Sequence, residues 1–516
     1  MSDSNSGLAG EQRKETGYEP LSLRHKGRVF FPGRDNSTAS SMRIAQVIHA
    51  FPPYSVGGSE NYTLALSKEL QRLGHEVAVF HRIADFTKEE YAVERGEMDG
   101  LQVWKINHIF RYYDRFEKLY RDDEIDKRFV AFLDAFQPQV VHIHHLTCLS
   151  TSSVLAVKER ACPVVMTLHD YWLICQRGQF LKTDLALCPG QEDKECVKCL
   201  SRELGVTETS RKITSRYHRV RADAPLLVNR VDALLRKIYG LYCHTFLPRQ
   251  NNALQQVRRR MEHMREVCKD IDLFIAPSRF LTERFLAFGI PSSKLLYSDN
   301  GYDVRFFPHG RKQRWKEGEK LRFGFIGVVF PPKGVHVLVE AFREIGEEAA
   351  ELTIHGSSVP YEGFDGYEEQ LRRLVAGHRN IRFAGPYHPS EVRNILSAID
   401  VLVVPSVWYE NSPLTIHEAF LAQVPIIASD LGGMREFVQD GITGFLFRPR
   451  DAADLREKIR HCIRNPALVR QLGVRAPAVK TITEDAVEME KRYRQLLTAK
   501  DRTARGILQL LGRIGR

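Results

Sequence analysis

The run RIAQVIHAFPPYSVGGSENYTLALSKELQRLGHEVAVF, residues 43–80, sets the fold class. Residues 43–49 have the pattern of a buried strand, and a loop of prolines and glycines follows at 51–58. Ser59 is predicted to cap a helix whose leucines favour one side, and a second strand at 75–80 follows that helix directly. A strand, a glycine loop, a helix and a strand in this order open a doubly wound parallel sheet.

The same alternation continues in two series. The first series of predicted strands covers 101–106, 140–144, 164–168, 273–277 and 294–297, with helices such as 124–136 and 279–288 between them. After a polar run, the second series covers 322–327, 352–355, 381–383, 401–405, 425–428 and 444–447. Two such series predict two Rossmann-like α/β domains facing an interdomain cleft, the default ligand site of this architecture.

These patterns divide the chain into four parts. Residues 1–41 form a polar arm that we expect to be mobile, and residues 481–516 form a C-terminal helix with a basic tail. The first domain is predicted at 42–305, with a cysteine-containing, helical insertion at about 171–270. The second domain is predicted at 306–480, after a linker within the polar run 310–320.

Composition excludes several classes of protein. The chain has 516 residues, of which 43% are hydrophobic and 27% charged, so wholesale disorder is excluded. No apolar run approaches the roughly 20 residues of a transmembrane helix, and the N-terminus lacks the apolar region of a secretory signal. These features favour a cytoplasmic enzyme, either free or peripheral on the cytosolic face of a membrane.

The net charge of +11 is concentrated in one segment. Residues 211–265 hold 13 Lys and Arg against 3 acids, a local charge of +10, so the rest of the chain is near neutral. Three interpretations stay open for this segment: a packed helix with a solvated basic side, contact with an anionic membrane or a polyprenyl-diphosphate-linked acceptor, and RNA binding. The tail 502–516 is a second, short basic amphipathic stretch.

The richest motif is PSVWYENSPLTIHE, residues 405–418, which follows a predicted buried strand and opens a helix. Ser412 is predicted as the N-cap and Pro413 as the first helical residue, which leaves the amides of Leu414 and Thr415 open to an anion. Glu410 lies in the loop before the helix, and Glu418 lies within it. A nucleotide sugar fits this order, although two glutamates eight residues apart also occur by chance.

A set of residues spread over most of the chain resembles retaining GT-B glycosyltransferases with an E-x7-E motif, the family 4 or glycogen-synthase-like type. The matching residues are Pro53, Gly57-Gly58, Glu60, 74–77, 167–170, Pro277-Ser278, 300–303, Gly327, Lys333-Gly334, His355-Gly356, Gly385, Pro405-Ser406, Glu410, Glu418, Pro425, Gly432-Gly433, Glu436, Gly441 and Gly444. The resemblance implies a GT-B fold and transfer of a sugar from a nucleotide-diphosphate-sugar donor to a glycan or lipid-linked glycan acceptor.

The resemblance also implies roles for individual residues. In such enzymes the residue at Glu410 contacts the transferred sugar, and the residue at Glu418 binds the ribose hydroxyls. The residue at Lys333 neutralises the diphosphate, and the one at His169 reaches the donor sugar from the first domain. The remaining donor contacts are expected at Gly57, Gly58, Asn411, Ser412, Pro413, Leu414 and Thr415, with the backbone near Tyr387 beside the base.

The chain departs from the pattern at one position. Many relatives have an arginine directly after the residue at Gly327, and this chain has Val328, so Lys333 and the helix start would bind the diphosphate without it. No second carboxylate matches a nucleophile, and Asp170 is expected to orient His169. We therefore favour front-face transfer, with the leaving diphosphate as base, and expect no catalytic metal.

Nine cysteines in a chain without secretory features make disulfides improbable. Cys175, Cys188, Cys196 and Cys199 lie within 25 residues and include one C-x-x-C pair, which predicts a structural zinc site. Free thiols and an iron–sulfur or redox role remain alternatives. The histidines at 142, 144 and 145 are interpreted as polar lining of the cleft rather than as metal ligands.

Two other functions remain open. One is a GT-B epimerase, which would act on the nucleotide sugar without an acceptor. The other is a non-catalytic protein that binds a membrane or nucleic acid through residues 211–265, and its binding would survive loss of both glutamates.

Overall fold

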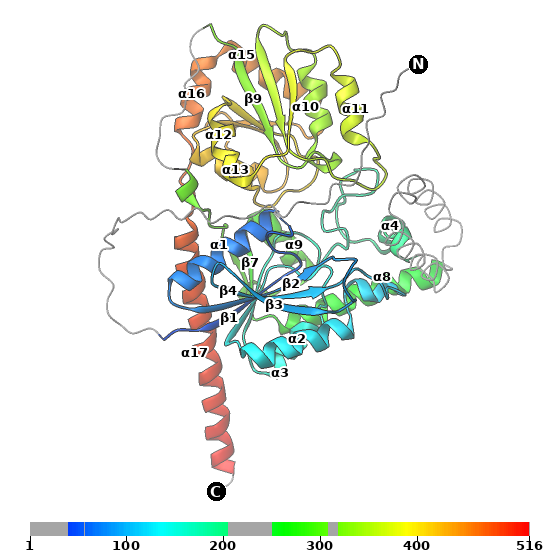
Figure 1. Ribbon diagram of the computed structural model, residues 1–516, viewed down its shortest axis with the longest axis vertical. Coiled ribbons are helices and arrows are strands. Elements are labelled where there is room, and N and C mark those ends of the chain that lie inside the picture. Colours follow the sequence, from blue (N-terminus) through cyan, green and yellow to red (C-terminus); the bar gives the residue numbers. More distant parts are fainter. Residues whose placement is uncertain (1–39, 56, 205–249, 308–317, 515–516) are drawn as a thin grey trace. The chain divides into compact units, whose positions relative to one another are not determined.

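The computed structural model describes residues 40–55, 57–204, 250–307 and 318–514 (Figure 1). Nearly all of the predicted polar arm lies outside the described residues. So do residues 205–249, which hold most of the predicted basic segment, and most of the candidate linker. Two parallel-sheet α/β domains of Rossmann type follow one another along the described chain. This architecture confirms the predicted fold class.

The first sheet has eight strands among the described residues, in the order β3-β4-β2-β1-β5-β6-β7-β8. All neighbouring strands are parallel except β3 and β4. The strands are β1 (Arg43–Ile48), β2 (Glu76–Ile83), β3 (Val93–Met98), β4 (Leu101–Asn107), β5 (Val140–Ile143), β6 (Val164–Thr167), β7 (Leu273–Ala276) and β8 (Leu295–Tyr297). The helices of this part are α1 (Gly58–Arg72), α2 (Asp123–Phe136), α3 (Ser153–Glu159), α4 (Asp193–Cys199), α5 (Ser201–Leu204), α8 (Gln250–Asp270) and α9 (Arg279–Phe288).

The second sheet has six parallel strands among the described residues, in the order β11-β10-β9-β12-β13-β14. The strands are β9 (Leu321–Ile326), β10 (Ala350–His355), β11 (Ile381–Gly385), β12 (Val401–Val404), β13 (Ile426–Ser429) and β14 (Gly444–Phe447). The helices are α10 (Val335–Phe342), α11 (Tyr367–Leu374), α12 (Val392–Ser397), α13 (Leu414–Leu421), α14 (Met434–Phe437), α15 (Ala452–Arg464) and α16 (Pro466–Val474). A short 3-10 turn, η4 (Pro331–Lys333), precedes α10.

Burial on both faces explains why β1 was recognisable in the sequence. Ala45 and Val47 belong to one hydrophobic core of the first domain, and Ile44 and Ile48 belong to the core on the opposite face. A parallel strand covered on both faces needs apolar residues on both sides of the pleat, so it reads as a nearly continuous apolar run. By contrast, β3 is an antiparallel strand beside β4, its sequence VERGEM is polar, and the sequence patterns did not predict it.

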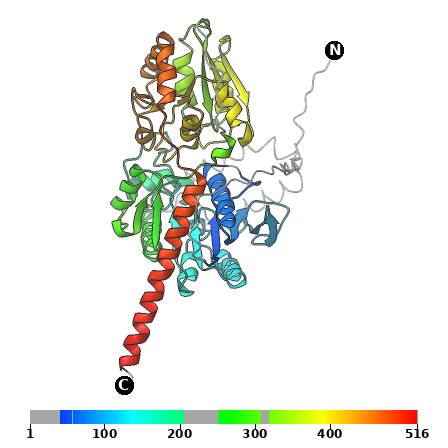
Figure 2. The same ribbon diagram turned by 90° about the vertical axis from the view of Figure 1, so that its left-hand side faces the viewer.

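The chain returns to the first domain through its last helix, α17 (Ile482–Ile514). Ile482, Ala486, Met489 and Tyr493 are buried in the same core as Ile44 of β1, and Figures 1 and 2 show α17 running beside α1. A second link joins the two domains directly. The carboxylate of Glu436 in α14 accepts hydrogen bonds from the amides of Arg279 and Phe280 at the start of α9. Both links join a segment that follows the first domain in the sequence to that domain.

Candidate functional site

Glu410 lies in the loop between β12 and α13, and its side chain is held by three donors. Its Oε1 accepts hydrogen bonds from Lys333 Nζ at 2.6 Å, Ser406 Oγ at 2.7 Å and Trp408 Nε1 at 3.0 Å. Glu410 is only 5% exposed, so the ion pair with Lys333 is largely shielded from water. The structure therefore brings together two of the predicted site residues, one from the end of η4 and one from the loop before α13.

Two glycines let the backbone of this loop approach its neighbours. A Cβ on Gly433 would lie 1.6 Å from the carbonyl oxygen of Asn411, and the Gly433 amide donates to the carbonyl of Glu410 at 2.7 Å. Gly334 has φ of +68°, and a Cβ there would lie 1.9 Å from the carbonyl oxygen of Pro405. These close backbone contacts explain why Gly334 and Gly433, which belong to the family resemblance, must lack a side chain at this site.

The first domain reaches the same loop at two points. Asn411 Nδ2 donates to the backbone carbonyl of His169 at 2.9 Å. Gly58, at the start of α1, lies so close to α13 that a Cβ would be 3.3 Å from Cδ1 of Leu414. The predicted contacts Gly57-Gly58, His169, Asn411 and Leu414 are therefore neighbours in space.

Glu418 is half-buried in α13, and this burial raises its pKa to about 7. Burial also raises the pKa of Tyr387 to about 12, and the charge of Glu418 adds to that effect, which is consistent with a position near Glu418. A carboxyl group that is costly to ionise without a ligand is suited to accept hydroxyl donors from a ligand that fills the space beside it.

The raised pKa of Glu418 predicts a pH-dependent stability. The folded protein holds this proton up to about pH 7, whereas the ordinary glutamate pKa is 4.5, so the free energy of unfolding should fall as the pH rises between these values. Glu418→Gln should remove this loss. Thermal unfolding of wild type and variant without ligand should show a variant more stable at pH 8 than wild type, with a smaller difference at pH 5. A stability difference between wild type and Glu418→Gln that is the same at pH 5 and pH 8 would contradict the raised pKa of Glu418.

His169 lies beside the buried imidazoles of His142 and His144. Its Nε2 lies 3.2 Å from Nδ1 of His144, whose Nε2 lies 2.7 Å from Oε1 of Gln46. His142 contacts the hydroxyls of Tyr493 and Thr167. Burial lowers the pKa of His142 and of His169 to about 3. His169 can thus exchange hydrogen bonds with a neutral hydroxyl, but it does not contribute a positive charge at neutral pH.

Asp170 does not orient His169, so that prediction was wrong. Its Oδ2 lies 2.9 Å from Nε2 of His145, and its Oδ1 accepts the amide of Trp172 at 2.7 Å. His144 contacts the ring of His169 instead. Strand alternation places His144 on the face that contacts His169. No local pattern shows whether His144 or the adjacent His145 hydrogen-bonds the Asp170 carboxylate.

Both predicted serine caps were also wrong. Gly57 is the N-cap of α1, and Ser59 Oγ donates to the carboxylate of Glu60. Helix α13 begins at Leu414 with Pro413 as its N-cap and no side-chain cap. The hydroxyl of Ser412 donates to Asp299 Oδ1 at 2.8 Å, because the fold places a carboxylate from a distant loop within its reach.

The four cysteines line one pocket of about 40 Å³, together with Arg260. Within the part of the chain that the structure describes, however, no three His, Cys, Asp or Glu side chains are grouped so that they could hold a metal ion. Cys188 Sγ donates to the carbonyl of Gly190, and burial raises the pKa of Cys196 to about 11. The arrangement of the described side chains therefore does not support the predicted zinc site.

Not all basic side chains in the described part of the basic segment lie at the surface. In α8, Arg260 is fully buried and donates to the carbonyl of Trp172 at 2.6 Å, while Arg258 pairs with Asp193 on α4. Residues 211–249 lie outside the described residues. No described helix combines the length and the apolar character needed to cross a bilayer.

Two sequence families match this chain. The family described as Glycosyltransferase Family 4 matches residues 56–197, and the family described as Glycosyl transferases group 1 matches residues 320–465. The first match lies in the part of the chain that contains Gly58 and His169, and the second covers Lys333, Glu410 and Glu418. The chain is thus similar to glycosyltransferases in sequence over the two matched regions, and its two parallel-sheet domains have the GT-B fold.

Individual relatives differ in how much of the chain they cover. Glycogen synthase of Mycobacterium tuberculosis is 30% identical over 183 residues, which make up 35% of this chain and 42% of that protein. The aligned part of the chain thus spans less than half of this relative. D-inositol 3-phosphate glycosyltransferase of Corynebacterium diphtheriae is 24% identical over 460 residues, or 84% of this chain and 90% of that protein.

Solved structures share the fold over nearly the whole chain. Sucrose-phosphate synthase from Thermosynechococcus elongatus superimposes with a TM-score of 0.59 at 19% identity, covering 89% of this chain and 100% of its own. Anabaena Alr3699/HepE in complex with UDP and glucose gives 0.54 at 15% identity, covering 87% and 99%. At these identities the likeness establishes the fold alone.

Proposed function

We propose that the protein is a retaining glycosyltransferase that moves a sugar from a nucleotide-diphosphate-sugar donor to a glycan or lipid-linked glycan in polysaccharide or glycolipid biosynthesis. The observation that carries the proposal is the Lys333–Glu410 pair, 2.6 Å apart, beside the start of α13. A cation, a carboxylate and a helix start together match the diphosphate and the hydroxyls of such a donor. The Anabaena neighbour forms a complex with UDP and glucose, which supports a donor of this class.

Each charged group has a proposed role in the transfer. Lys333 neutralises the negative charge that develops on the departing diphosphate, and Glu410 binds hydroxyls of the transferred sugar. Glu418 binds the ribose hydroxyls, with the backbone near Tyr387 beside the base. His169 exchanges a hydrogen bond with the donor sugar as a neutral imidazole, in keeping with its low pKa.

The direct Lys333–Glu410 contact has a consequence for binding. Lys333 donates to Glu410 Oε1, and the same oxygen also accepts from Ser406 and Trp408. When the diphosphate takes Lys333, the other two donors still fix the carboxylate. Glu410 can therefore keep its orientation while its partner moves to the phosphate, which makes Ser406 and Trp408 positioning residues that the sequence patterns did not reveal.

Retention is proposed to occur by front-face transfer. The bond between the anomeric carbon and the diphosphate oxygen breaks, and the acceptor oxygen forms its bond on the same face. The acceptor proton passes to the leaving phosphate oxygen, so no group on the protein needs to accept it. Asp170, the nearest candidate nucleophile in the first domain, is paired with His145 and bonded to the Trp172 amide, which supports a mechanism without a covalent intermediate.

Thermal unfolding with UDP, GDP, ADP and their sugars tests the donor class. A ligand at about 100 times its Kd should add roughly 2.7 kcal/mol to the free energy of unfolding. We expect a shift with one base in wild type and none with Glu418→Ala, because the variant lacks the ribose contact. If no nucleotide stabilises the wild type, the proposed function is wrong.

Incubation of the donor with and without an acceptor glycan distinguishes a transferase from an epimerase. The proposed transferase releases nucleoside diphosphate at a rate that rises with added acceptor glycan. An epimerase converts the nucleotide sugar and keeps its diphosphate bond, so acceptor has no effect. Conversion of the sugar with the nucleotide still attached would contradict the proposal.

A further inference from the structure

A line of three side chains leads from the middle of β1 to the imidazole of His169. Gln46 on β1 is fully buried, and its Oε1 lies 2.7 Å from Nε2 of His144. Nδ1 of His144 lies 3.2 Å from Nε2 of His169, whereas the two ring centroids are 5.4 Å apart. Because the nitrogens are much closer than the centroids, they point toward each other, as a hydrogen bond between the rings requires. The line therefore consists of two hydrogen bonds in series.

Gln46 decides where His144 carries its proton, because an amide oxygen only accepts hydrogen bonds. A neutral imidazole has one N–H and one bare nitrogen, and burial holds the pKa of both histidines well below its ordinary value. Nε2 of His144 is therefore the N–H that donates to Gln46, which leaves Nδ1 of His144 bare. Nε2 of His169 is in turn the N–H that donates to this bare nitrogen. His169 is thus left with its lone pair on Nδ1.

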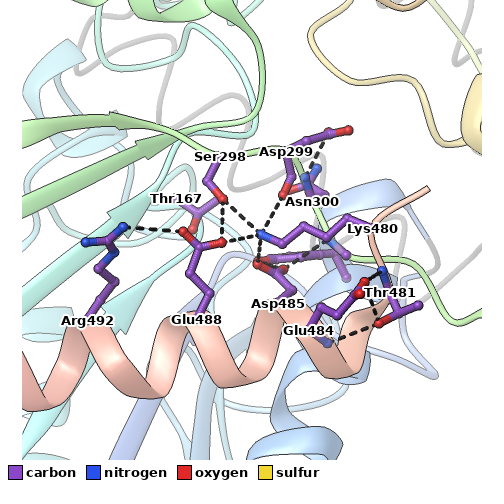
Figure 3. Close-up of polar contacts among 12 residues, drawn as sticks. Thr167, Ser298, Asp299, Asn300, Lys480, Thr481, Glu484, Asp485, Glu488 and Arg492 are labelled. Atoms are coloured by element: carbon purple, nitrogen blue, oxygen red, sulfur yellow. Dashed lines mark hydrogen bonds and ion pairs between the residues drawn. The ribbon is translucent and has the colours of Figure 1, made fainter. Parts of the chain in front are cut away.

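Packing holds both rings in place. The ring of Tyr62 on α1 lies edge-on to both imidazoles, with its centroid 5.8 Å from that of His144 and 5.4 Å from that of His169. The Tyr62 hydroxyl donates to Asp485 Oδ2 at 2.7 Å, and Asp485 of α17 pairs with Lys480 at 2.6 Å (Figure 3). A ring that is held in this way keeps the same nitrogen toward each partner. The positions of the protons then follow from the partners alone.

Nδ1 is the nitrogen that His169 can offer to a ligand. Among the described residues, no hydrogen bond reaches this atom, whereas Nε2 is taken by His144. His169 is partly exposed, and its carbonyl accepts a hydrogen bond from Asn411 in the loop that also carries Glu410. The imidazole therefore belongs to the site, and its remaining nitrogen is an acceptor.

We infer that Gln46 is a positioning residue that sets the tautomer of His169, so that the bare Nδ1 accepts a hydrogen bond from a hydroxyl of the donor sugar. Gln46 acts through His144 and, being fully buried, does not meet the sugar itself. This inference rests on the proposed function, in which His169 bonds the donor sugar. A hydroxyl has a hydrogen to give to Nδ1, and a carboxylate has none. The site therefore favours a hydroxyl over a carboxylate at this position of the sugar.

The direction of this hydrogen bond affects the transition state more than the bound donor. Positive charge develops on the sugar as the diphosphate leaves. A bare nitrogen presents partial negative charge to the sugar, whereas an N–H presents partial positive charge. A hydroxyl can bond either form, because it can both donate and accept. The wrong tautomer of His169 should therefore still bind the donor but stabilise the transition state less.

Nitrogen-15 NMR of the full chain with labelled histidine reads the tautomers without any ligand, because the shift of a ring nitrogen depends on whether it carries a proton. At pH 7 we expect the proton of wild-type His169 on Nε2. In Gln46→Leu the acceptor is lost, so the proton of His144 should move to Nδ1 and donate to His169, whose own proton should then lie on Nδ1. The His169 signals are identified by their loss in His169→Ala. A wild-type proton on Nδ1, or the same His169 tautomer in wild type and Gln46→Leu, would overturn the inference.

A double-mutant cycle tests whether the tautomer matters for transfer. With the nucleotide sugar that stabilises the wild type, Gln46→Leu should lower kcat about tenfold and leave KM nearly unchanged, because the lost interaction acts in the transition state. In a His169→Ala background, the same substitution should cause no further loss, because Gln46 acts only through His169. Tyr493→Phe is the control. It removes a hydroxyl that contacts His142 in the same core, and it should leave kcat near wild type.

The cycle distinguishes positioning from loss of structure. If Gln46→Leu acted by weakening the fold, its loss would multiply with that of His169→Ala in the double variant. That result, or a Gln46→Leu enzyme with wild-type kcat, would overturn the inference while the proposed function stands. His169→Ala with wild-type kcat would refute the proposed role of His169, and a wild type that no nucleotide sugar stabilises would refute the proposed function. In both cases the inference falls as well.

Discussion

Replacing Glu410 with Gln should lower kcat by about 10²- to 10³-fold, while nucleoside-diphosphate binding is retained or strengthened. The amide oxygen of Gln can still accept from Ser406 and Trp408, so the loop should keep its shape. The negative charge beside the transferred sugar is lost, which removes stabilisation from the transition state. Lys333 is also released from its 2.6 Å ion pair and becomes fully available to the diphosphate.

Steady-state kinetics and nucleotide titration on the same preparations measure these two effects. Glu369→Gln provides the matched control, because the Glu369 side chain is 68% exposed on α11, pairs only with Arg373 among the ion pairs of the described residues and is in no predicted contact with the donor. It should leave both kcat and Kd unchanged. A Glu410→Gln enzyme with wild-type kcat would show that Glu410 does not act on the transferred sugar.

Replacing Gly433 with Ala should destabilise the protein by about 3 kcal/mol or more and abolish transfer. The backbone of Gly433 has an ordinary φ of −65°, so the cost is steric and not conformational. The Cβ of the new alanine would lie 1.6 Å from the Asn411 carbonyl oxygen. The hydrogen bond from the amide of residue 433 to the Glu410 carbonyl would be broken. The loop that carries Glu410 and Asn411 would have to move away from Lys333 and His169.

Gly346→Ala is the control for this prediction. A Cβ on Gly346 would meet no atom within 4 Å, so the substitution should be tolerated. Urea unfolding gives the change in stability, and a donor-hydrolysis or transfer assay gives the change in activity. Gly433→Ala with wild-type stability and activity would show that the loop tolerates this displacement and that its close packing is not needed by the site.

The sequence alone determined the alternation of strands and helices. The helix predicted at 279–288 is α9 residue for residue, and the predicted strands of both series lie within three residues of the observed ends. These elements were readable because parallel strands covered on both faces require apolar residues at nearly every position. The exception is β3, a polar strand at the edge of its sheet, where pairing with β4 outweighs its unfavourable composition.

Within the site, the sequence also indicated the chemical groups but not their partners. Glu410, Glu418, Lys333 and His169 were predicted from a motif and a resemblance, and their roles remain proposals. The contact between Lys333 and Glu410 spans 77 residues, and that between Ser412 and Asp299 spans 113. No local pattern encodes such pairs.

Only the tertiary structure decided what each polar group binds. Ser412 has the sequence context of a helix cap, but its hydroxyl donates to the carboxylate of Asp299, 113 residues away in the sequence. The Ser412 hydroxyl donates its proton to the Asp299 carboxylate because the fold brings this charged acceptor within reach, and hydrogen bonds to charged groups are strong. Local sequence therefore fixes where helices and strands begin, whereas competition between partners from distant segments fixes the hydrogen bonds of the site.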